Sequence, residues 1–200
     1  MKYAHKLNIE FPVPKDEDRE YLSGHGRLKK STKYNLNRWD FNSDEELDSY
    51  LELVAPLKPY LRTASVTKIR LLAHHVHVWD KSIINFYYQT NGEVTTFWEG
   101  KIERDDRWSQ DNGNGYINVN PDLLKPAQRY VAAPGDVWLI DAMQPHSVFP
   151  NVETESNTAN WLKNRQLIKH TRENERKLVQ LIFTIPPKKA LRKLGYEPEI

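Results

Sequence analysis

The pattern of hydrophobic and polar residues along the chain changes near residue 65. Before that point one stretch shows helical spacing, with hydrophobic residues three or four positions apart. Ser43 stands just before this stretch and Glu46 follows three positions later, which is the spacing of a capping box for a first helical turn. Pro56 and Pro59 are predicted to end the helix. The hydrophobic positions of the stretch are Leu47, Tyr50, Leu51 and Val54.

After residue 65 the pattern favours β-strands. Runs of β-branched and aromatic residues are separated by turn residues such as Asn91-Gly92, a strong hairpin signal. The segments 103–115 and 153–175 are polar, and we expect loops there, with a short helix as an alternative for the second. Residues 121–133 are also expected to form a loop. The expected strands are 66–78, 83–90, 94–100, 115–119, 136–141, 144–149 and 177–185.

These elements predict a mainly β (α+β) fold with an N-terminal helical segment. Strands without helices alternating between them favour an antiparallel sandwich or a jelly-roll barrel over a parallel sheet. The 200 residues suit a single domain, 1–200. Within it we expect an N-terminal loop and helical support at 1–62, a β core at 66–186 and a basic C-terminal tail at 187–200.

Composition narrows the function classes. The 29 basic and 27 acidic residues leave a net charge of +2, which argues against a nucleic-acid-binding protein. The chain has no cysteine, so disulfides and thiolate metal sites are excluded. No stretch approaches the roughly 20 apolar residues of a membrane span, and the N-terminus lacks the apolar core of a signal peptide. We therefore expect a soluble, cytoplasmic protein without a membrane or nucleic-acid partner.

Three of the seven histidines fall within four positions, 74–77. In a strand, side chains at i and i+2 share a face, so His75 and His77 point together while His74 points the other way. Two imidazoles on one face can chelate a transition metal. His146, at the end of another strand, is a candidate third ligand, and Asp80 is the nearest carboxylate. The alternative is that all three histidines are ordinary strand residues.

The order of four sequence segments resembles the 2-oxoglutarate/Fe(II)-dependent dioxygenases, near their prolyl-hydroxylase-like and small phage and bacterial hydroxylase branches. The resemblance covers somewhat over half of the chain, and the third segment is its most specific part. The segments are HHVHVWD (74–80), INFYYQTNGEVTTFW (84–98), APGDVWLIDAMQPHSV (133–148) and ERKLVQLIFTI (175–185).

The resemblance implies a double-stranded β-helix (a cupin-like jelly roll), Fe(II) as the metal and 2-oxoglutarate as cosubstrate. It implies that His146 is the distal iron ligand and that Arg176 grips the far carboxylate of 2-oxoglutarate. A planar guanidinium suits that task because it binds a carboxylate through two hydrogen bonds. Asn85, Tyr87 and Thr96 are expected to line the cosubstrate pocket. The implied reaction is hydroxylation of a protein side chain, a peptide or a small metabolite, with release of succinate and CO₂.

The chain departs from the family at the proximal ligands, where the family has His-x-Asp. Here His75-Val76-His77 has the family's spacing, so His77 takes the place of the aspartate in a three-histidine site. In a second arrangement His77 and Asp80 are the proximal pair, and in a third only two histidines bind the metal and water takes the acid's place. We favour His75, His77 and His146.

Two other functions stay open. The first is a cupin-like protein that binds a metal or a ligand without 2-oxoglutarate chemistry, which would not need Arg176. The second is a structural jelly roll whose histidines are incidental. The sequence does not identify the substrate or the oligomeric state.

Overall fold

The protein is described by a computed structural model that covers residues 2–15, 36–69, 72–103, 116–149 and 176–198. Within these ranges, eleven strands form two antiparallel sheets. The six-stranded sheet has the order β1 (Ala4–Leu7), β9 (Val137–Asp141), β5 (Ser82–Gln89), β11 (Arg176–Phe183), β3 (Leu61–Ile69) and β2 (Leu36–Trp39). The five-stranded sheet has the order β7 (Tyr116–Asn118), β4 (Leu72–His77), β10 (His146–Phe149), β6 (Val94–Gly100) and β8 (Leu124–Val131).

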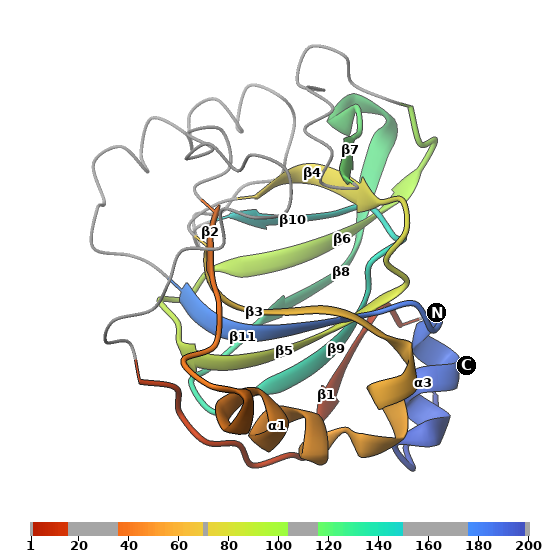
Figure 1. Ribbon diagram of the computed structural model, residues 1–200. Coiled ribbons are helices and arrows are strands. Elements are labelled where there is room, and N and C mark those ends of the chain that lie inside the picture. The colour runs from red at the N-terminus through yellow and green to blue at the C-terminus, as the bar shows by residue number, and fades with distance from the viewer. Residues whose placement is uncertain (1, 16–35, 70–71, 104–115, 150–175, 199–200) are drawn as a thin grey trace.

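The strand order is that of a jelly roll. Going along the chain, β3 lies in the large sheet, β4 in the small sheet, β5 in the large sheet and β6 in the small sheet. After β8 the alternation resumes, with β9 and β11 in the large sheet and β10 in the small sheet between them. Two facing four-stranded layers, β9-β5-β11-β3 and β4-β10-β6-β8, therefore make up a double-stranded β-helix (Figure 1). The predicted mainly β, jelly-roll fold is confirmed.

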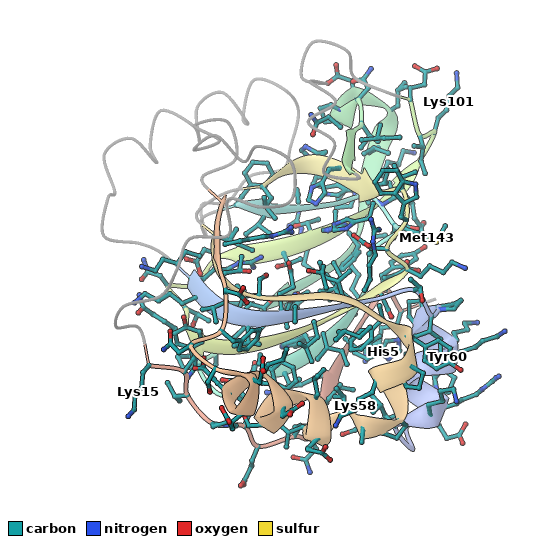
Figure 2. All side chains as sticks on the ribbon, in the orientation of Figure 1. His5, Lys15, Lys58, Tyr60, Lys101 and Met143 are labelled. Atoms are coloured by element: carbon teal, nitrogen blue, oxygen red, sulfur yellow. The ribbon has the colours of Figure 1, made fainter. Side chains whose placement is uncertain are left out.

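Side chains fill the space between the sheets and under the helices (Figure 2). The buried hydrophobic residues among those described form two large clusters and a smaller one on the outer face of the small sheet. Inward-facing residues such as Tyr87 and Leu178 pack between the two sheets. Their chain neighbours Phe86 and Val179 face the other way, because side chains alternate along a strand, and pack under the helices. The helices that cover this outer face of the large sheet are α1 (Asp44–Leu53), the 3₁₀ helix η1 (Ala55–Tyr60) and α3 (Pro187–Lys193).

The predicted N-terminal helix is confirmed, together with its cap. The side chain of Ser43 accepts a hydrogen bond from the backbone N–H of Glu46 at 3.2 Å. Glu46 in turn accepts one from the backbone N–H of Asn42 at 2.8 Å. The chain then turns into η1, whose first turn contains Pro56. Among the described residues, no helix is both long and apolar enough to cross a membrane.

Three expectations about element boundaries were wrong. The single strand expected at 66–78 is two strands, β3 and β4, which lie in different sheets. The β core begins at Leu61, and the N-terminal segment adds β1 and β2 to the edges of the large sheet besides its helix. Residues 187–193, which were expected to belong to a basic tail, form the helix α3. This helix is held in place because Ala190 and Leu191 bury their side chains against the sheet.

The expectation of a loop at 121–133 was also wrong. This segment begins with a short 3₁₀ helix, η2 (Pro121–Leu123), and most of the rest is β8. Pro126 argues against a central strand, since proline has no N–H for the ladder. β8 is an edge strand, paired only with β6, and an edge position tolerates proline. The segments 104–115 and 150–175, which hold most of the two expected polar loops, lie outside the described residues.

Two glycines with positive φ offer a matched test of the packing between β6 and β8. A Cβ on Gly100 (φ 143°) would overlap the backbone oxygen of Leu123, whereas a Cβ on Gly135 (φ 91°) would meet open space. Both alanine variants pay a backbone strain of about 1–3 kcal/mol. We expect Gly100→Ala to lose about 1–3 kcal/mol more in free energy of unfolding than Gly135→Ala, measured by urea denaturation. Equal losses would contradict this packing.

Candidate metal centre

Three histidine side chains meet between the two sheets. β4 carries His75 and His77, and β10 begins at His146, which stands opposite His75 in the antiparallel ladder. One ring nitrogen from each histidine lies within 4.8 Å of the others. The ring centroids of His75 and His146 are 4.2 Å apart, and His77 is 5.4 Å from each of them. All three are buried, so the cluster is an enclosed candidate for a metal ion.

Strand alternation separates His74 from this cluster. The side chain of His74 points to the outer face of the small sheet, where its ring lies 4.6 Å from that of Trp98 and 5.5 Å from that of Phe149. Burial lowers the pKa of His74 to about 4. His74 is therefore neutral at physiological pH and packs on the face opposite His75 and His77, the orientation that strand alternation predicted.

The ring of His77 is oriented by Asp80. Nδ1 of His77 donates a hydrogen bond to Oδ2 of Asp80 at 2.9 Å, and Arg62 donates to Oδ1 at 2.6 Å. Burial acts to raise the pKa of Asp80, but His77 and Arg62 together hold it below its usual value, so the carboxylate stays charged. The bond at Nδ1 leaves Nε2 as the His77 nitrogen for a metal. Arg62 itself lies over the ring of Trp79 at 5.0 Å.

The ring of His146 is oriented by the backbone. Its Nδ1 donates to the carbonyl oxygen of Gln144 at 2.8 Å, which again leaves Nε2 for the cluster. Burial lowers the pKa of His146 to about 3, and the nearby His77 and Arg176 act in the same direction. Burial also lowers the pKa of His77, although Asp80 opposes the shift. These imidazoles are therefore neutral at physiological pH, which is the state that binds a metal.

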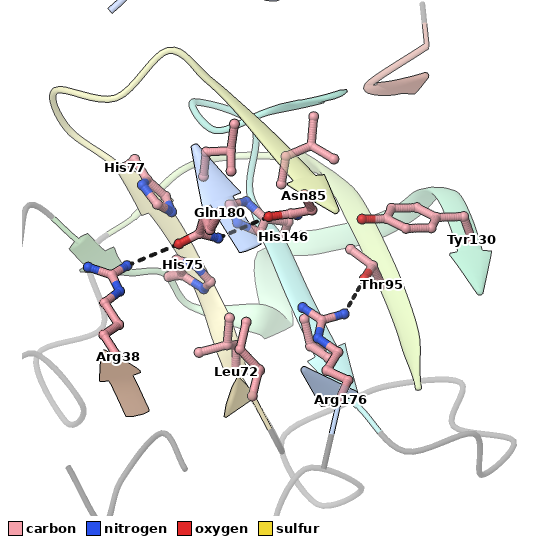
Figure 3. A pocket seen from close by; sticks show the side chains of 14 residues that line it. Arg38, Leu72, His75, His77, Asn85, Thr95, Tyr130, His146, Arg176 and Gln180 are labelled. Atoms are coloured by element: carbon pink, nitrogen blue, oxygen red, sulfur yellow. Dashed lines mark hydrogen bonds between the residues drawn. The ribbon is translucent and has the colours of Figure 1, made fainter. Parts of the chain in front are cut away.

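A cavity opens beside the histidines and encloses about 390 Å³, counting the solvent at its mouth. Arg176, the first residue of β11, lines it (Figure 3). Nη1 of Arg176 donates to Oγ1 of Thr95 at 3.0 Å, and the guanidinium lies 5.5 Å from the ring centre of Tyr87. Nε of Arg176 is buried and has no hydrogen-bond partner among the described residues. The guanidinium thus retains donor capacity for a ligand in the cavity.

Amide and hydroxyl groups line the cavity wall between Arg176 and the histidines. Gln180 donates to Asn85 at 3.1 Å, Asn85 donates to the hydroxyl of Tyr87 at 3.2 Å, and the Tyr87 and Tyr130 hydroxyls are 2.9 Å apart. Burial, reinforced by Tyr87, raises the pKa of Tyr130 well above its usual value, so this phenol stays neutral. On the opposite side Nη2 of Arg38 donates to Gln180 at 3.4 Å (Figure 3).

Most of the predicted site residues meet in this one place. His75, His77, His146, Arg176 and Asn85 line the cavity. Tyr87, predicted to line the pocket, is not among the lining residues: it lies behind that wall, where its hydroxyl accepts a hydrogen bond from Asn85 and its ring faces Arg176. Asp80, the alternative ligand, is not in the group of candidate ligand atoms and lies behind His77.

The prediction that Thr96 lines the pocket was wrong, because the lining residue is its neighbour Thr95. Alternate side chains of a strand face opposite sides, so Thr96 lies on the face of β6 that carries Trp98. Trp98 belongs to the outer hydrophobic cluster, whereas Phe97 belongs to the cluster between the sheets. Sequence reasoning also missed Arg38, Gln180 and Tyr130. Strand alternation in β11 could have predicted Gln180, because residues i and i+4 of a strand share a face and Gln180 lies four positions after Arg176.

Comparison with known proteins adds a weak similarity to solved structures. No family model matches the sequence, and no curated protein does either. The chain is similar to E. coli YcfD, with a TM-score of 0.43 and 11% identity, over 78% of this chain and 35% of that one. It is similar to vicilin from hazelnut, Corylus avellana, with a TM-score of 0.38 and 10% identity, over 82% of this chain and 32% of that one. It is also similar to an oxalate decarboxylase, with a TM-score of 0.34 and 11% identity, over 90% of this chain and 35% of that one. The chain spans about a third of the length of each, and these similarities carry no argument about function.

Replacing Asp80 by asparagine tests its role behind His77. An amide has one acceptor oxygen for the two donors, His77 and Arg62, so the His77 ring loses its orientation. We expect Asp80→Asn to weaken Co(II) binding about 10- to 100-fold, measured by visible absorption titration, with the stoichiometry kept. Asp136→Asn is the matched control, because Asp136 is also ion-paired, with Lys6 at 2.6 Å, but lies outside the cluster. If Asp80→Asn abolished binding as fully as His75→Ala does, Asp80 would itself be a ligand.

Proposed function

We propose that this protein is an Fe(II)- and 2-oxoglutarate-dependent oxygenase that hydroxylates an unidentified substrate. The observation that supports the proposal best is the placement of two unlike groups in one cavity. A cluster of three buried imidazoles and a buried guanidinium, that of Arg176, line the same space. A metal-binding protein without a cosubstrate needs the first group, but it has no use for the second.

The donor set fits a first-row transition metal. Imidazole nitrogens suit iron, zinc, copper and nickel, whereas Mg²⁺ and Ca²⁺ prefer oxygen ligands. Three ligands leave coordination positions open, as a catalytic site requires. Two of the rings, those of His77 and His146, are already held by hydrogen bonds at Nδ1. The cluster is thus organised before a metal binds.

Arg176 fits the end of a dicarboxylate. Its fork of N–H groups matches a carboxylate in two hydrogen bonds, and burial makes such a charged bond strong. Thr95 and the ring of Tyr87 hold the guanidinium from two sides, so little freedom is lost on binding. The unpartnered Nε is the donor that a carboxylate in the cavity would satisfy. The same reasoning assigns Asn85 to the wall that orients the cosubstrate.

When bound, Fe(II) and 2-oxoglutarate supply the activation of O₂, in which one oxygen atom enters succinate, CO₂ is released and the other oxygen atom enters a C–H bond of the substrate. The chain's own residues position the reactants and limit access of water. Leu72, Ile83 and Val148 give the cavity apolar walls, and Tyr130 offers a neutral hydroxyl that takes no part in proton transfer at physiological pH.

The second candidate function is a metal-binding jelly roll without 2-oxoglutarate chemistry, favoured by the fact that the histidine cluster is complete without Arg176. Substitution of Arg176 separates the two. We expect Arg176→Met to weaken 2-oxoglutarate binding to the Fe(II) protein at least 10-fold while Fe(II) affinity stays the same. The measurement is an anaerobic titration that follows the visible metal-to-ligand band, and then O₂-dependent succinate formation.

Arg129→Met, on the exposed face of β8, is the control and should behave as the wild type. If 2-oxoglutarate produced no band in the wild type, or if Arg176→Met bound it unchanged, the oxygenase proposal would fail and the metal-binding alternative would stand.

Two adjacent threonines give a finer test of the same pocket. Thr95→Val removes the hydroxyl that holds Nη1 of Arg176, at nearly constant volume, whereas Thr96→Val alters the opposite face of β6. We expect Thr95→Val to raise the dissociation constant of 2-oxoglutarate about 3- to 10-fold and Thr96→Val to leave it unchanged, by the same titration. The reverse order would mean that the register of β6 is wrong.

A further inference from the structure

Four polar side chains form one continuous row of hydrogen bonds along the cavity wall. The row begins on β11, crosses β5 and ends on β8. All four side chains are buried, so a hydrogen bond lost from the row leaves a polar atom without water to replace its partner. The members of the row, in order, are Gln180, Asn85, Tyr87 and Tyr130.

The row has a fixed direction, because the group at its start can only donate. The guanidinium of Arg38 donates to the amide oxygen of Gln180 at 3.4 Å, and a guanidinium has no lone pair with which to accept. Gln180 therefore turns its NH₂ group to the amide oxygen of Asn85, at 3.1 Å. The NH₂ group of Asn85 is then left to donate to the hydroxyl of Tyr87, at 3.2 Å. Each member donates to the next one along the row.

The same reasoning decides which of the two tyrosines donates in the last bond. The Tyr87 oxygen accepts from Asn85, so the Tyr87 hydrogen needs an acceptor of its own. The Tyr130 oxygen, at 2.9 Å, is the other hydrogen-bond partner of this hydroxyl among the described residues. If Tyr130 donated instead, the fully buried Tyr87 hydrogen would have no acceptor there. Tyr87 therefore donates, and the hydrogen of Tyr130 is left for another acceptor.

The end of the row lies beside the guanidinium of Arg176. That guanidinium is 5.5 Å from the ring centre of Tyr87, whose hydroxyl meets the hydroxyl of Tyr130. Figure 3 shows Thr95 between the side chains of Tyr130 and Arg176, and all three residues line the cavity, whereas Tyr87 does not. A neutral O–H donor and a charged N–H donor thus border the same part of the cavity.

We propose that the row makes Tyr130 a hydrogen-bond donor to the carboxylate that Arg176 binds, and that Gln180 is the positioning residue that sets the direction of the row. A ligand with an NH₂ group at this place would meet donors on both sides and leave them unpaired, which is how a polar site discriminates between close analogues. The inference rests on the proposed function only for the identity of the ligand, since any carboxylate beside Arg176 would be bound in this way.

The first test removes the hydroxyl at the end of the row. The protein is the full chain loaded with Zn(II), so that no turnover takes place, and the probe is 2-oxoglutarate, titrated by calorimetry. We expect Tyr130→Phe to raise the dissociation constant about 5- to 20-fold, because one buried hydrogen bond to a charged group is lost. Tyr60→Phe, on η1 beyond the outer face of the large sheet, is the matched control and should bind as the wild type does.

The second test reverses the row and keeps the Tyr130 hydroxyl. A carboxylate at position 180 still accepts from Arg38 but cannot donate to Asn85. In Gln180→Glu the Asn85 amide therefore turns over and accepts from Tyr87. Tyr87 in turn accepts from Tyr130, whose O–H no longer points to the ligand.

The added negative charge of Gln180→Glu weakens anion binding by itself, so the deciding quantity is the effect of Tyr130→Phe in each background. We expect Tyr130→Phe to cost about 5- to 20-fold in affinity in the wild type and less than about 2-fold in Gln180→Glu. A merely structural role of Gln180 would leave the two costs equal. Thermal unfolding checks that each variant is folded. Asn85→Asp, which reverses the last two bonds in the same way, replaces Gln180→Glu if the latter does not fold.

A second probe separates this inference from the proposed function. Glutarate, a dicarboxylate without the keto group, is titrated into the same proteins. If 2-oxoglutarate fails to bind but glutarate shows the loss in Tyr130→Phe, the oxygenase proposal falls and the donor role of Tyr130 stands. If Tyr130→Phe binds both probes as the wild type does, the Tyr130 hydrogen is used within the protein and the inference is overturned. If neither probe binds to the wild type, both proposals fall.

Discussion

The pairing of β10 with β4 is the constraint on which the candidate centre depends. It sets His146 opposite His75, and the strand's other edge pairs with β6, where His146 stands opposite Phe97. Because β10 is held on both sides, a slip by one residue would turn His146 away from the cavity and break two ladders at once. Residues more than 60 positions apart in the chain are thus held together by backbone hydrogen bonds of the small sheet.

Placing three imidazoles side by side in the interior has an electrostatic consequence. Two protonated rings at these centroid separations would repel strongly in a medium of low dielectric constant, and burial already disfavours the charged form. Burial lowers the pKa of both His77 and His146, and the nearby His77 lowers that of His146 further. Asp80 and the Gln144 carbonyl hold the Nδ1 protons on the outer side of the rings, so the lone pairs are directed inward. A neutral, preoriented donor set is the result.

The sequence predicted most of the residues of the site, but it did not predict which of two neighbouring residues in a strand faces the cavity. The pairing of His75 with His77 follows from strand alternation alone. His146 was a candidate because it stands at the end of another strand, and the family resemblance then matched it to the distal ligand, whereas Arg176 was found through the resemblance alone. Thr96 was chosen over Thr95 because nothing in a run of two threonines tells which one faces inward. Arg38 carries no local signal, since its place in the cavity comes from β2 joining the far edge of the large sheet. The separation of β3 from β4 gave no signal, because the segment 66–78 contains no glycine, proline or asparagine.

In the proposed oxygenase, His77 would stand where an acidic ligand is expected, and the charge of the cavity would depend on that exchange. Asp80 keeps its negative charge close to the centre, but it lies behind the ring, and Arg62 offsets it there. In that proposal, three neutral ligands would leave the charge of a divalent metal uncompensated, and Arg176 lines the same cavity. Such a space is stable when filled by anions, because buried charges need partners of opposite sign. The dianionic cosubstrate of the proposed function would supply part of that opposite charge.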